Sequence, residues 1–249
     1  MFEESSWINV ERYLQLDDRL VLVVGSCEQH GYLSLASDTK VPMAIACEAC
    51  LRESVLLAPA LPYGVSPYFT AYPGTISPRP ETLAIVVCEL IEGAIARGFH
   101  RILVSNGHGG NTGVLVPVLI EAGNAHPQAR LSIFHCWRRQ AVAAVAHQAG
   151  FAQYHANWSE NFAITRVEPV PEGEKEAPII PATASAPAMR TILGDGSFGG
   201  RYQAPQDLSD RFSPPPSKRC HRAAQPVDEI RDARCTCMYP VSCIPEIRL

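Results

Sequence analysis

Short apolar segments that alternate with stretches of helical periodicity constrain the fold of this chain most strongly. The segment Arg19–Val24 (RLVLVV) is too short for a helix and rich in valine, which is typical of a strand buried on both faces. Apolar residues at helical spacing follow it between Asp38 and Glu53. The same order then recurs, with strands expected over 55–61, 101–105 and 131–135 and helices over 81–97, 112–123 and 138–149.

Strands that alternate with helices of this length predict βαβ units. We therefore expect an α/β fold: a single three-layer domain with a mainly parallel β-sheet flanked by helices. Right-handed crossovers place the carboxyl ends of the strands at one edge of such a sheet, where ligands bind. With 47% hydrophobic and 18% charged residues, the chain has enough apolar material for a sizeable core.

The C-terminal part of the sequence has a different character. From Phe212 onward the chain contains three consecutive prolines, four cysteines and scattered arginines, without a sustained strand or helix period. We expect residues 1–211 to form the domain and residues 212–249 to form an irregular, poorly packed tail.

Composition and charge exclude several classes of protein. A net charge of -4 argues against a protein that binds nucleic acid through phosphate contacts. No apolar run approaches the roughly 18 residues of a membrane span, and the acidic N-terminus does not resemble a signal peptide. Nine scattered cysteines in such a chain favour a cytoplasmic protein over a disulfide-stabilised secreted one. We expect neither nucleic acid nor a membrane as a partner.

Side chains that suit metal ions follow two of the expected strands. Glu28 and His30 come after the first strand and, being two residues apart, share one side of an extended segment. His108 follows the strand over 101–105 within NGHGGN, where the neighbouring glycines leave it as the one side chain able to bind an ion. Asp38 stands at the start of an expected helix. The fold should bring these groups to the same sheet edge.

A later segment, His155-Ala-Asn-Trp-Ser-Glu160, adds a histidine and a carboxylate on an expected helix. Each of these positions taken alone is more often an ordinary loop residue, and Asp38 could instead cap its helix. Together, clustered carboxylate and imidazole groups favour a metal site, and this mixture of ligands suits Zn, Mn or Fe. The glycine-rich GDGSFGG over 194–200 lacks the lysine of a phosphate loop and predicts a turn near the pocket or a subunit contact.

These motifs in order, EQHG with a following DT, NGHGGN and HAxxxEN, resemble the creatininase (creatinine amidohydrolase) family. The resemblance covers most of the chain and implies a single α/β domain, a homohexamer and two divalent metal ions per chain. Carried over by motif, Glu28 and His108 would hold one ion, His30 and Glu160 the other, and Asp38 would bridge them.

The resemblance also implies a hydrolytic reaction. Water activated as hydroxide on the two ions would attack the carbonyl of a small cyclic or formylated amide, and His155 would protonate the leaving nitrogen. Tyr68, Tyr72 and Trp158 could line the substrate pocket or simply pack in the interior. In the creatinine-hydrolysing enzyme an aromatic residue and a glutamate follow the NGH, where this chain has two glycines. Glu160 is therefore the candidate carboxylate for the second ion.

Two other interpretations stay open. Activated water is not selective by itself, so a two-metal centre could hydrolyse another bond, such as a phosphoester or a ring C–C bond. A relative that binds metal without turnover would be a metal-binding protein only. The expectation from the sequence is a metal-dependent hydrolase that acts on C–N bonds other than peptide bonds, with a small-molecule amide as its substrate.

Overall fold

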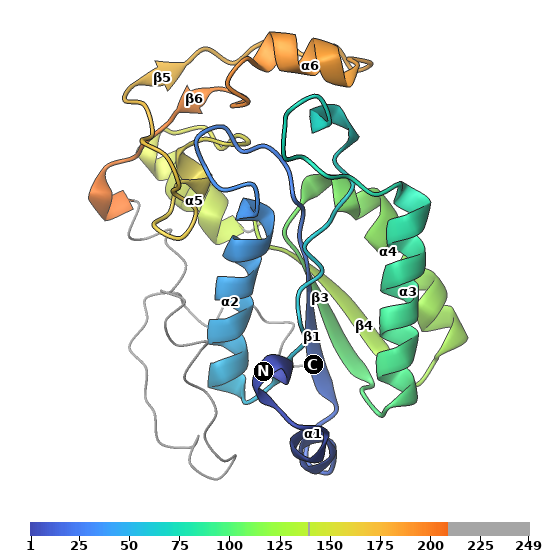
Figure 1. The fold of residues 1–249 in the computed structure, drawn as a ribbon. Coiled ribbons are helices and arrows are strands. Elements are labelled where there is room, and N and C mark those ends of the chain that lie inside the picture. The colour runs from blue at the N-terminus through green and yellow to red at the C-terminus, as the bar shows by residue number, and fades with distance from the viewer. Residues whose placement is uncertain (139, 209–249) are drawn as a thin grey trace.

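The computed structural model describes residues 1–138 and 140–208. A parallel sheet of four strands lies at its centre, in the order β2-β1-β3-β4 (Figure 1). Its strands are β1 (Arg19–Val24), β2 (Leu56–Leu57), β3 (Arg101–Asn106) and β4 (Arg130–His135). The strand expected over 55–61 is shorter than predicted, because beyond Leu57 only a single bridge joins this segment to β1.

Helices cover both faces of this sheet. Helix α2 packs on one face, and helices α3 and α4, which contact each other, cover the opposite face (Figure 1). The helices are α1 (Trp7–Leu14), α2 (Ser37–Glu53), α3 (Pro80–Ala96), α4 (Thr112–Ala125), α5 (Gln140–Ala149) and α6 (Ala186–Leu193). The three-layer α/β architecture predicted from the sequence is confirmed.

Strand β1 shows why its sequence is a continuous apolar run. Leu22 and Val24 pack into the core shared with α3 and α4, whereas Val21 and Val23 pack into the core shared with α2. All four side chains are at most 6% exposed. Burial of each such side chain stabilises the fold by roughly 1.5–3 kcal/mol, so a strand with helices on both faces cannot alternate with polar residues.

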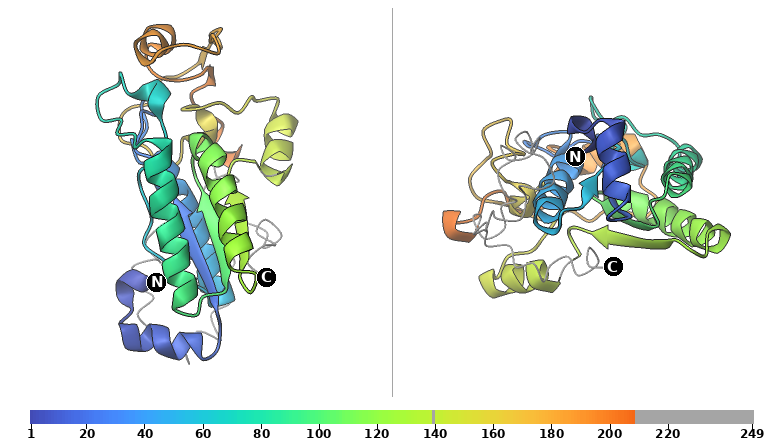
Figure 2. Two further views of the ribbon diagram at one scale, coloured as in Figure 1. Left: turned by 90° about the vertical axis from the view of Figure 1, so that its right-hand side faces the viewer. Right: turned by 90° about the horizontal axis from the view of Figure 1, so that it is seen from below.

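A smaller structural layer lies beyond the carboxyl ends of the strands. It contains α6 and the antiparallel pair β5 (Glu174–Lys175) and β6 (Gly200–Arg201), which stand above the sheet in two views (Figures 1 and 2). Within the described residues, no helix is both long and apolar enough to cross a membrane. The tail expected over 212–249, and the boundary expected at 211, lie outside the described residues.

Candidate metal centre

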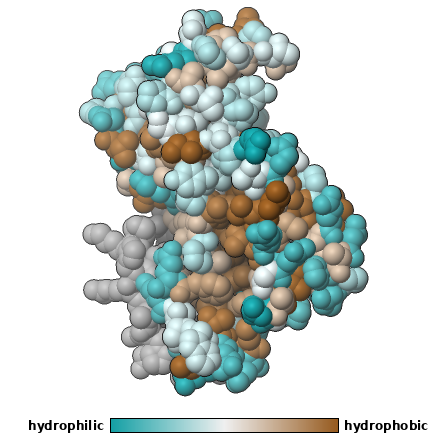
Figure 3. Space-filling model, turned by 45° about the vertical axis from the view of Figure 1, so that its right-hand side comes forward, coloured by the Kyte–Doolittle hydropathy of each residue, from teal (hydrophilic) through white to brown (hydrophobic). Residues whose placement is uncertain are grey.

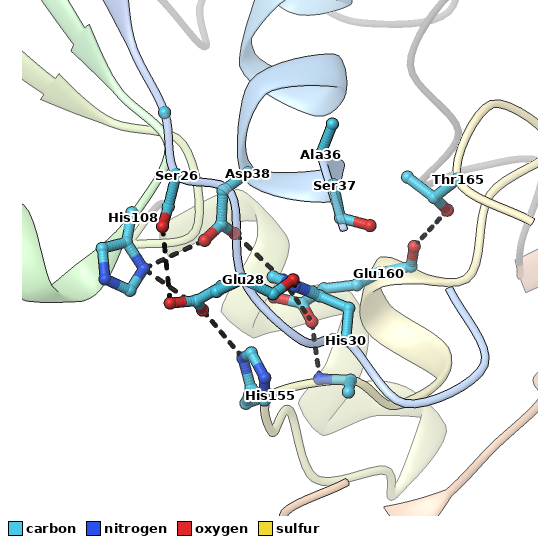
Figure 4. Close-up of polar contacts among 12 residues, drawn as sticks. Ser26, Glu28, His30, Ala36, Ser37, Asp38, His108, His155, Glu160 and Thr165 are labelled. Carbon is cyan, nitrogen blue, oxygen red and sulfur yellow. Dashed lines mark hydrogen bonds and ion pairs between the residues drawn. The ribbon is translucent and has the colours of Figure 1, made fainter. Parts of the chain in front are cut away.

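Five of the predicted metal-binding side chains converge beyond the carboxyl ends of β1 and β3 (Figure 4). The segment that leaves β1 carries two of them, the segment that leaves β3 carries one, the first turn of α2 carries one, and a loop after α5 carries the last. Four are at most 8% exposed and the fifth, Glu160, is partly buried; the set is Glu28, His30, Asp38, His108 and Glu160.

Asp38 lies at the middle of this group. Its Oδ1 is 3.1 Å from Nε2 of His30, and its Oδ2 is 2.9 Å from Nδ1 of His108. Helix α2 begins at Ser37, and the residue before it, Ala36, makes no side-chain capping bond. Asp38 therefore faces the two histidines from inside the first turn, and the capping alternative does not apply.

Each of the two glutamates lies close to one of the two histidines. Oε1 of Glu28 is 3.4 Å from Nδ1 of His108, and Oε2 of Glu160 is 3.8 Å from Nε2 of His30. Potential ligand atoms of Glu28, Asp38 and His108 lie within 4.8 Å of one another, as do those of His30, Asp38 and Glu160. These two potential ligand sets share Asp38, which is the grouping that the family resemblance implies; a third potential set joins Glu28, His30 and His155.

Both histidines direct a ring nitrogen at Asp38 while main-chain oxygen occupies the other. Nδ1 of His30 lies 3.2 Å from the carbonyl oxygen of Glu28, and Nε2 of His108 lies 2.9 Å from that of Val65. A neutral imidazole donates through one nitrogen and carries a lone pair on the other. In the neutral rings the nitrogens that face Asp38 would therefore carry the lone pairs, an arrangement common in metal-binding histidines.

The charges of the cluster also fit divalent cations. Burial and then the charge of Asp38 raise the pKa of Glu28 to about 7. Burial by itself would lower the pKa of both histidines. The charge of Asp38 instead raises the pKa of His30 to about 10. A hydrogen bond to Asp38 raises the pKa of His108 to about 9. Oε1 of Glu28 is buried and accepts no hydrogen bond from the residues that the structure describes. Three carboxylates that are largely shielded from solvent require cations or protons to balance their negative charge.

Gly110 leaves no room for a side chain beside His108. A Cβ atom at this position would lie 2.1 Å from the carbonyl oxygen of Val65 and 2.5 Å from Nε2 of His108. Any side chain here would displace the contact that orients His108. The carboxylate that lies near His30 belongs to Glu160, whose Oε2 accepts the N–H of Ala156 at 2.6 Å.

The segment that carries His155 and Glu160 differs from the expected helix. Only Trp158–Glu160 forms a single 3-10 turn, which the side chain of Asn157 caps by accepting from Ser159. The 155–160 spacing therefore does not place these residues on one helical face. Instead, the loop bends so that both side chains reach the centre from different directions (Figure 4).

His155 lies at the border of the centre. Its Nδ1 is 3.7 Å from Oε1 of Glu28, and its Nε2 is 2.9 Å from the carbonyl oxygen of Gln29. The ring stacks on Phe69, with centroids 4.8 Å apart and planes 12° apart, and also contacts Phe198. Burial and then the nearby His30 lower the pKa of His155 to about 3, which favours a neutral ring.

The predicted pocket residues are placed less uniformly. Tyr72 packs edge-on against Phe69, close to the centre, and its ring also lies under the guanidinium of Arg190. Tyr68 is 52% exposed in the short turn Pro67–Phe69, so its side chain is accessible to a ligand.

Trp158 packs in the interior, which is one of the two alternatives expected for it. It is only 2% exposed, packs with Phe151 and Phe162, and donates its indole N–H to the carbonyl oxygen of Ala152 at 2.8 Å. The ring of Trp158 packs against other side chains and its N–H has a partner inside the protein. Such a side chain stabilises the loop that carries it.

Sequence reasoning missed the residues that support the ligands. Ser26 and Ser66 have their hydroxyl oxygens 2.6 Å apart, and the hydroxyl of Ser26 donates toward Oε2 of Glu28 at 3.5 Å. Gln29 and Phe198 contact His155. Two features of the sequence could have pointed to these residues. Gln29 stands between two candidate ligands, and Phe198 belongs to GDGSFGG. The contact of Phe198 with His155 places this motif near the centre, which fits the predicted turn near the pocket.

Comparison with known proteins gives the relationships of the chain. Residues 3–204 match the profile of the family Creatininase, described as creatinine amidohydrolase. A mycofactocin precursor peptide peptidase of Mycobacterium tuberculosis (strain CDC 1551 / Oshkosh) is 37% identical over 107 residues, which cover 39% of this chain and 42% of the relative. A creatinine amidohydrolase of Pseudomonas putida is 30% identical over 120 residues, covering 45% of this chain and 46% of the relative.

These alignments span less than half the length of either curated relative. A crystal structure of creatinine amidohydrolase (creatininase) superposes with a TM-score of 0.72 at 21% identity, over 84% of this chain and 90% of that one, which shows the same fold. Since the family profile spans most of the sequence, the chain belongs to the creatininase family.

Proposed function

We propose that this protein is a metal-dependent amidohydrolase that cleaves the C–N bond of a small cyclic or formylated amide. The observation that carries the proposal is the pair of ligand sets that share Asp38 at the carboxyl edge of the sheet. The relative from Pseudomonas putida, named creatinine amidohydrolase, supports an amide as the substrate class.

Each ligand set would hold one divalent ion, Zn, Mn or Fe. Glu28, Asp38 and His108 form one set, and His30, Asp38 and Glu160 form the other. Mixed carboxylate and imidazole ligands suit these metals. When bound, such ions polarise a carbonyl group and lower the pKa of water, which is the chemistry that amide hydrolysis requires.

His155 would move the proton. Because Gln29 occupies Nε2, Nδ1 is the nitrogen that faces the centre. A neutral ring in this position accepts a proton at Nδ1 from the attacking water and delivers it to the leaving nitrogen. The stack on Phe69 excludes solvent from one ring face and keeps the imidazole in place.

A second candidate function is hydrolysis of a peptide amide bond. The relative from Mycobacterium tuberculosis is named a precursor peptide peptidase, and the segment that it shares with this chain is 37% identical. The reacting group would be the same, a carbonyl bonded to nitrogen, so the metal ligands do not separate the two substrates. Contacts outside the ligand sets would do so.

The test combines metal removal with a substrate panel. Protein purified without chelators would be assayed by elemental mass spectrometry and then with creatinine, other cyclic amides, N-formyl compounds and short peptides. We expect about two ions per chain and turnover of one amide class that chelator abolishes and the returned metal restores. Metal without turnover of any amide would contradict the proposal and favour another bond type or a purely metal-binding protein.

We also propose that the chain forms a homo-oligomer. Hydrophobic surface extends over the face on which α3 comes forward (Figure 3). On α3 and α4, Ile85, Leu90 and Ile120 are each at least 45% exposed. Exposed apolar residues gathered on one face are typical of subunit contacts. Analytical ultracentrifugation would give the number of chains, and a monomer at micromolar concentration would contradict this part of the proposal.

A further inference from the structure

Gln29 is the residue between two proposed metal ligands, and its side chain points away from both of them. The side-chain amide of Gln29 contacts Gly196 in the glycine-rich turn, whereas Glu28 and His30 each form a potential ligand set with Asp38. Gln29 is only 5% exposed. A buried amide at such a position needs partners for its oxygen and its nitrogen.

Two main-chain groups determine the orientation of this amide. Oε1 accepts the N–H of Gly31 at 3.1 Å, and Nε2 donates to the carbonyl oxygen of Gly196 at 3.0 Å. Because one partner is a donor and the other an acceptor, exchanging the oxygen and nitrogen of the amide would lose both bonds. The same Nε2 lies 3.0 Å from Nε2 of His155.

Gln29 thus offers Nε2 of His155 two kinds of partner. Its side-chain nitrogen is a donor at 3.0 Å, and its main-chain oxygen is an acceptor at 2.9 Å. Nε2 of a histidine finds a partner here whether or not it carries a proton. In either tautomer the ring keeps the same orientation, with Nδ1 toward Glu28.

The glycine-rich turn holds Gln29 from the other side. A Cβ atom on Gly196 would lie 1.8 Å from Oε1 of Gln29, and Gly196 has a φ of +94°, so this position requires glycine. The neighbouring Asp195 accepts from Lys175 at 2.5 Å and from the hydroxyl of Tyr202 at 2.6 Å. Lys175 also donates to the main-chain oxygens of Ser197 in the turn and of Leu193, the last residue of α6. The turn is therefore anchored independently of the metal ligands.

We propose that Gln29 is a positioning residue for His155, and that the GDGSFGG turn exists in this chain to hold the Gln29 amide in place. Gln29 keeps the imidazole oriented while its own side chain contacts none of the proposed metal ligands. The catalytic meaning of that orientation rests on the proposed function, but the orientation itself can be measured with or without metal.

The experiment compares three proteins labelled with ¹⁵N-histidine, each metal-free and zinc-loaded. Gln29→Met removes the amide at nearly constant volume. Gln203→Met is the matched control, because the Gln203 amide also donates to main-chain oxygens but lies in an exposed segment. The readouts are the ¹⁵N shifts of the His155 ring, the zinc content per chain and the melting temperature.

We expect Gln29→Met to shift both His155 ring nitrogens while zinc per chain equals that of the wild type. Gln203→Met should leave these resonances unchanged. Unchanged His155 resonances in Gln29→Met would overturn the proposal, and so would loss of zinc without a change at His155. A protein that binds zinc but hydrolyses no amide would contradict the proposed function and leave this test intact.

The wild-type protein supplies a second measurement if Gln29→Met does not fold. The side-chain amide protons of Gln29 should show nuclear Overhauser effects to the carbon-bound ring protons beside Nε2 of His155. The same protons should exchange with solvent at least tenfold more slowly than those of Gln203. Absence of the Overhauser effects, or equal exchange rates, would overturn the proposal.

Discussion

Nδ1 of His108 lies 2.9 Å from Oδ2 of Asp38, although the opposite nitrogen of the same ring already faces the carbonyl oxygen of Val65. In the neutral ring this contact brings a lone pair against a carboxylate oxygen, which is unfavourable unless a cation or a proton lies between them. We therefore expect the stability of the protein to depend on bound metal and on pH. Substitutions in the cluster should change its metal content.

Asp38→Asn should remove metal from both ligand sets, because the carboxylate that they share loses its charge. We expect the metal content to fall from about two ions per chain to near zero, with hydrolytic activity lost in parallel. Elemental mass spectrometry gives the content. Asp207→Asn, at an exposed position outside the centre, is the matched control, and a full metal content in Asp38→Asn would contradict the assignment.

Glu160→Gln should affect one ion only. The amide oxygen of glutamine can still accept the N–H of Ala156, so the loop should keep its shape. The metal content should fall to about one ion per chain, since Glu28 and His108 remain. Glu168→Gln, in an exposed loop, controls for the charge change. Loss of both ions would show that Glu160 does not belong to one set alone.

Gly110→Ala should destabilise the protein, whereas Gly113→Ala should not. The new methyl at position 110 would collide with main-chain oxygen at 2.1 Å, while position 113 in α4 has open space. We expect Gly110→Ala to cost about 1–3 kcal/mol and to weaken metal binding through His108. Gly113→Ala should stabilise by about 0.5–1 kcal/mol, since alanine favours a helix. Urea unfolding measures both, and equal effects would contradict the steric argument.

The stability of the metal-free protein should fall as pH rises. The folded-state pKa values of His30, about 10, and His108, about 9, lie above the usual value of about 6.5 in an unfolded chain. The folded state therefore binds more protons than the unfolded state across this window. The resulting stabilisation is complete below about pH 6.5 and is lost as pH rises through about 9 to 10.

Urea unfolding in chelator should show this loss as a decrease on the order of 1 kcal/mol or more between about pH 7 and about pH 9.5. Saturating zinc should remove the decrease, because metal binding requires deprotonated ligands and strengthens with pH. His30→Gln should lose the larger part of the slope. A metal-free stability that rises over this interval would contradict the charge arrangement described for the centre.

Local sequence determined the elements and the first ligands. The run Arg19–Val24 forms β1 with the predicted bounds, because side chains that are apolar at every position after Arg19 require helices on both faces of a strand. Once β1 and β3 are parallel neighbours, Glu28, His30 and His108 must follow carboxyl ends at the same edge. Asp38 joins them because it lies in the first turn of α2, which begins at Ser37.

The tertiary structure alone decided which loop side chains turn toward this edge. Trp158 and Glu160 are two residues apart, yet packing buries the first in the interior and leaves the second at the centre. Gln29 meets His155 across 126 positions of sequence and Gly196 across 167. No periodicity encodes such contacts, because the direction of a loop side chain depends on the distant segments that pack around it.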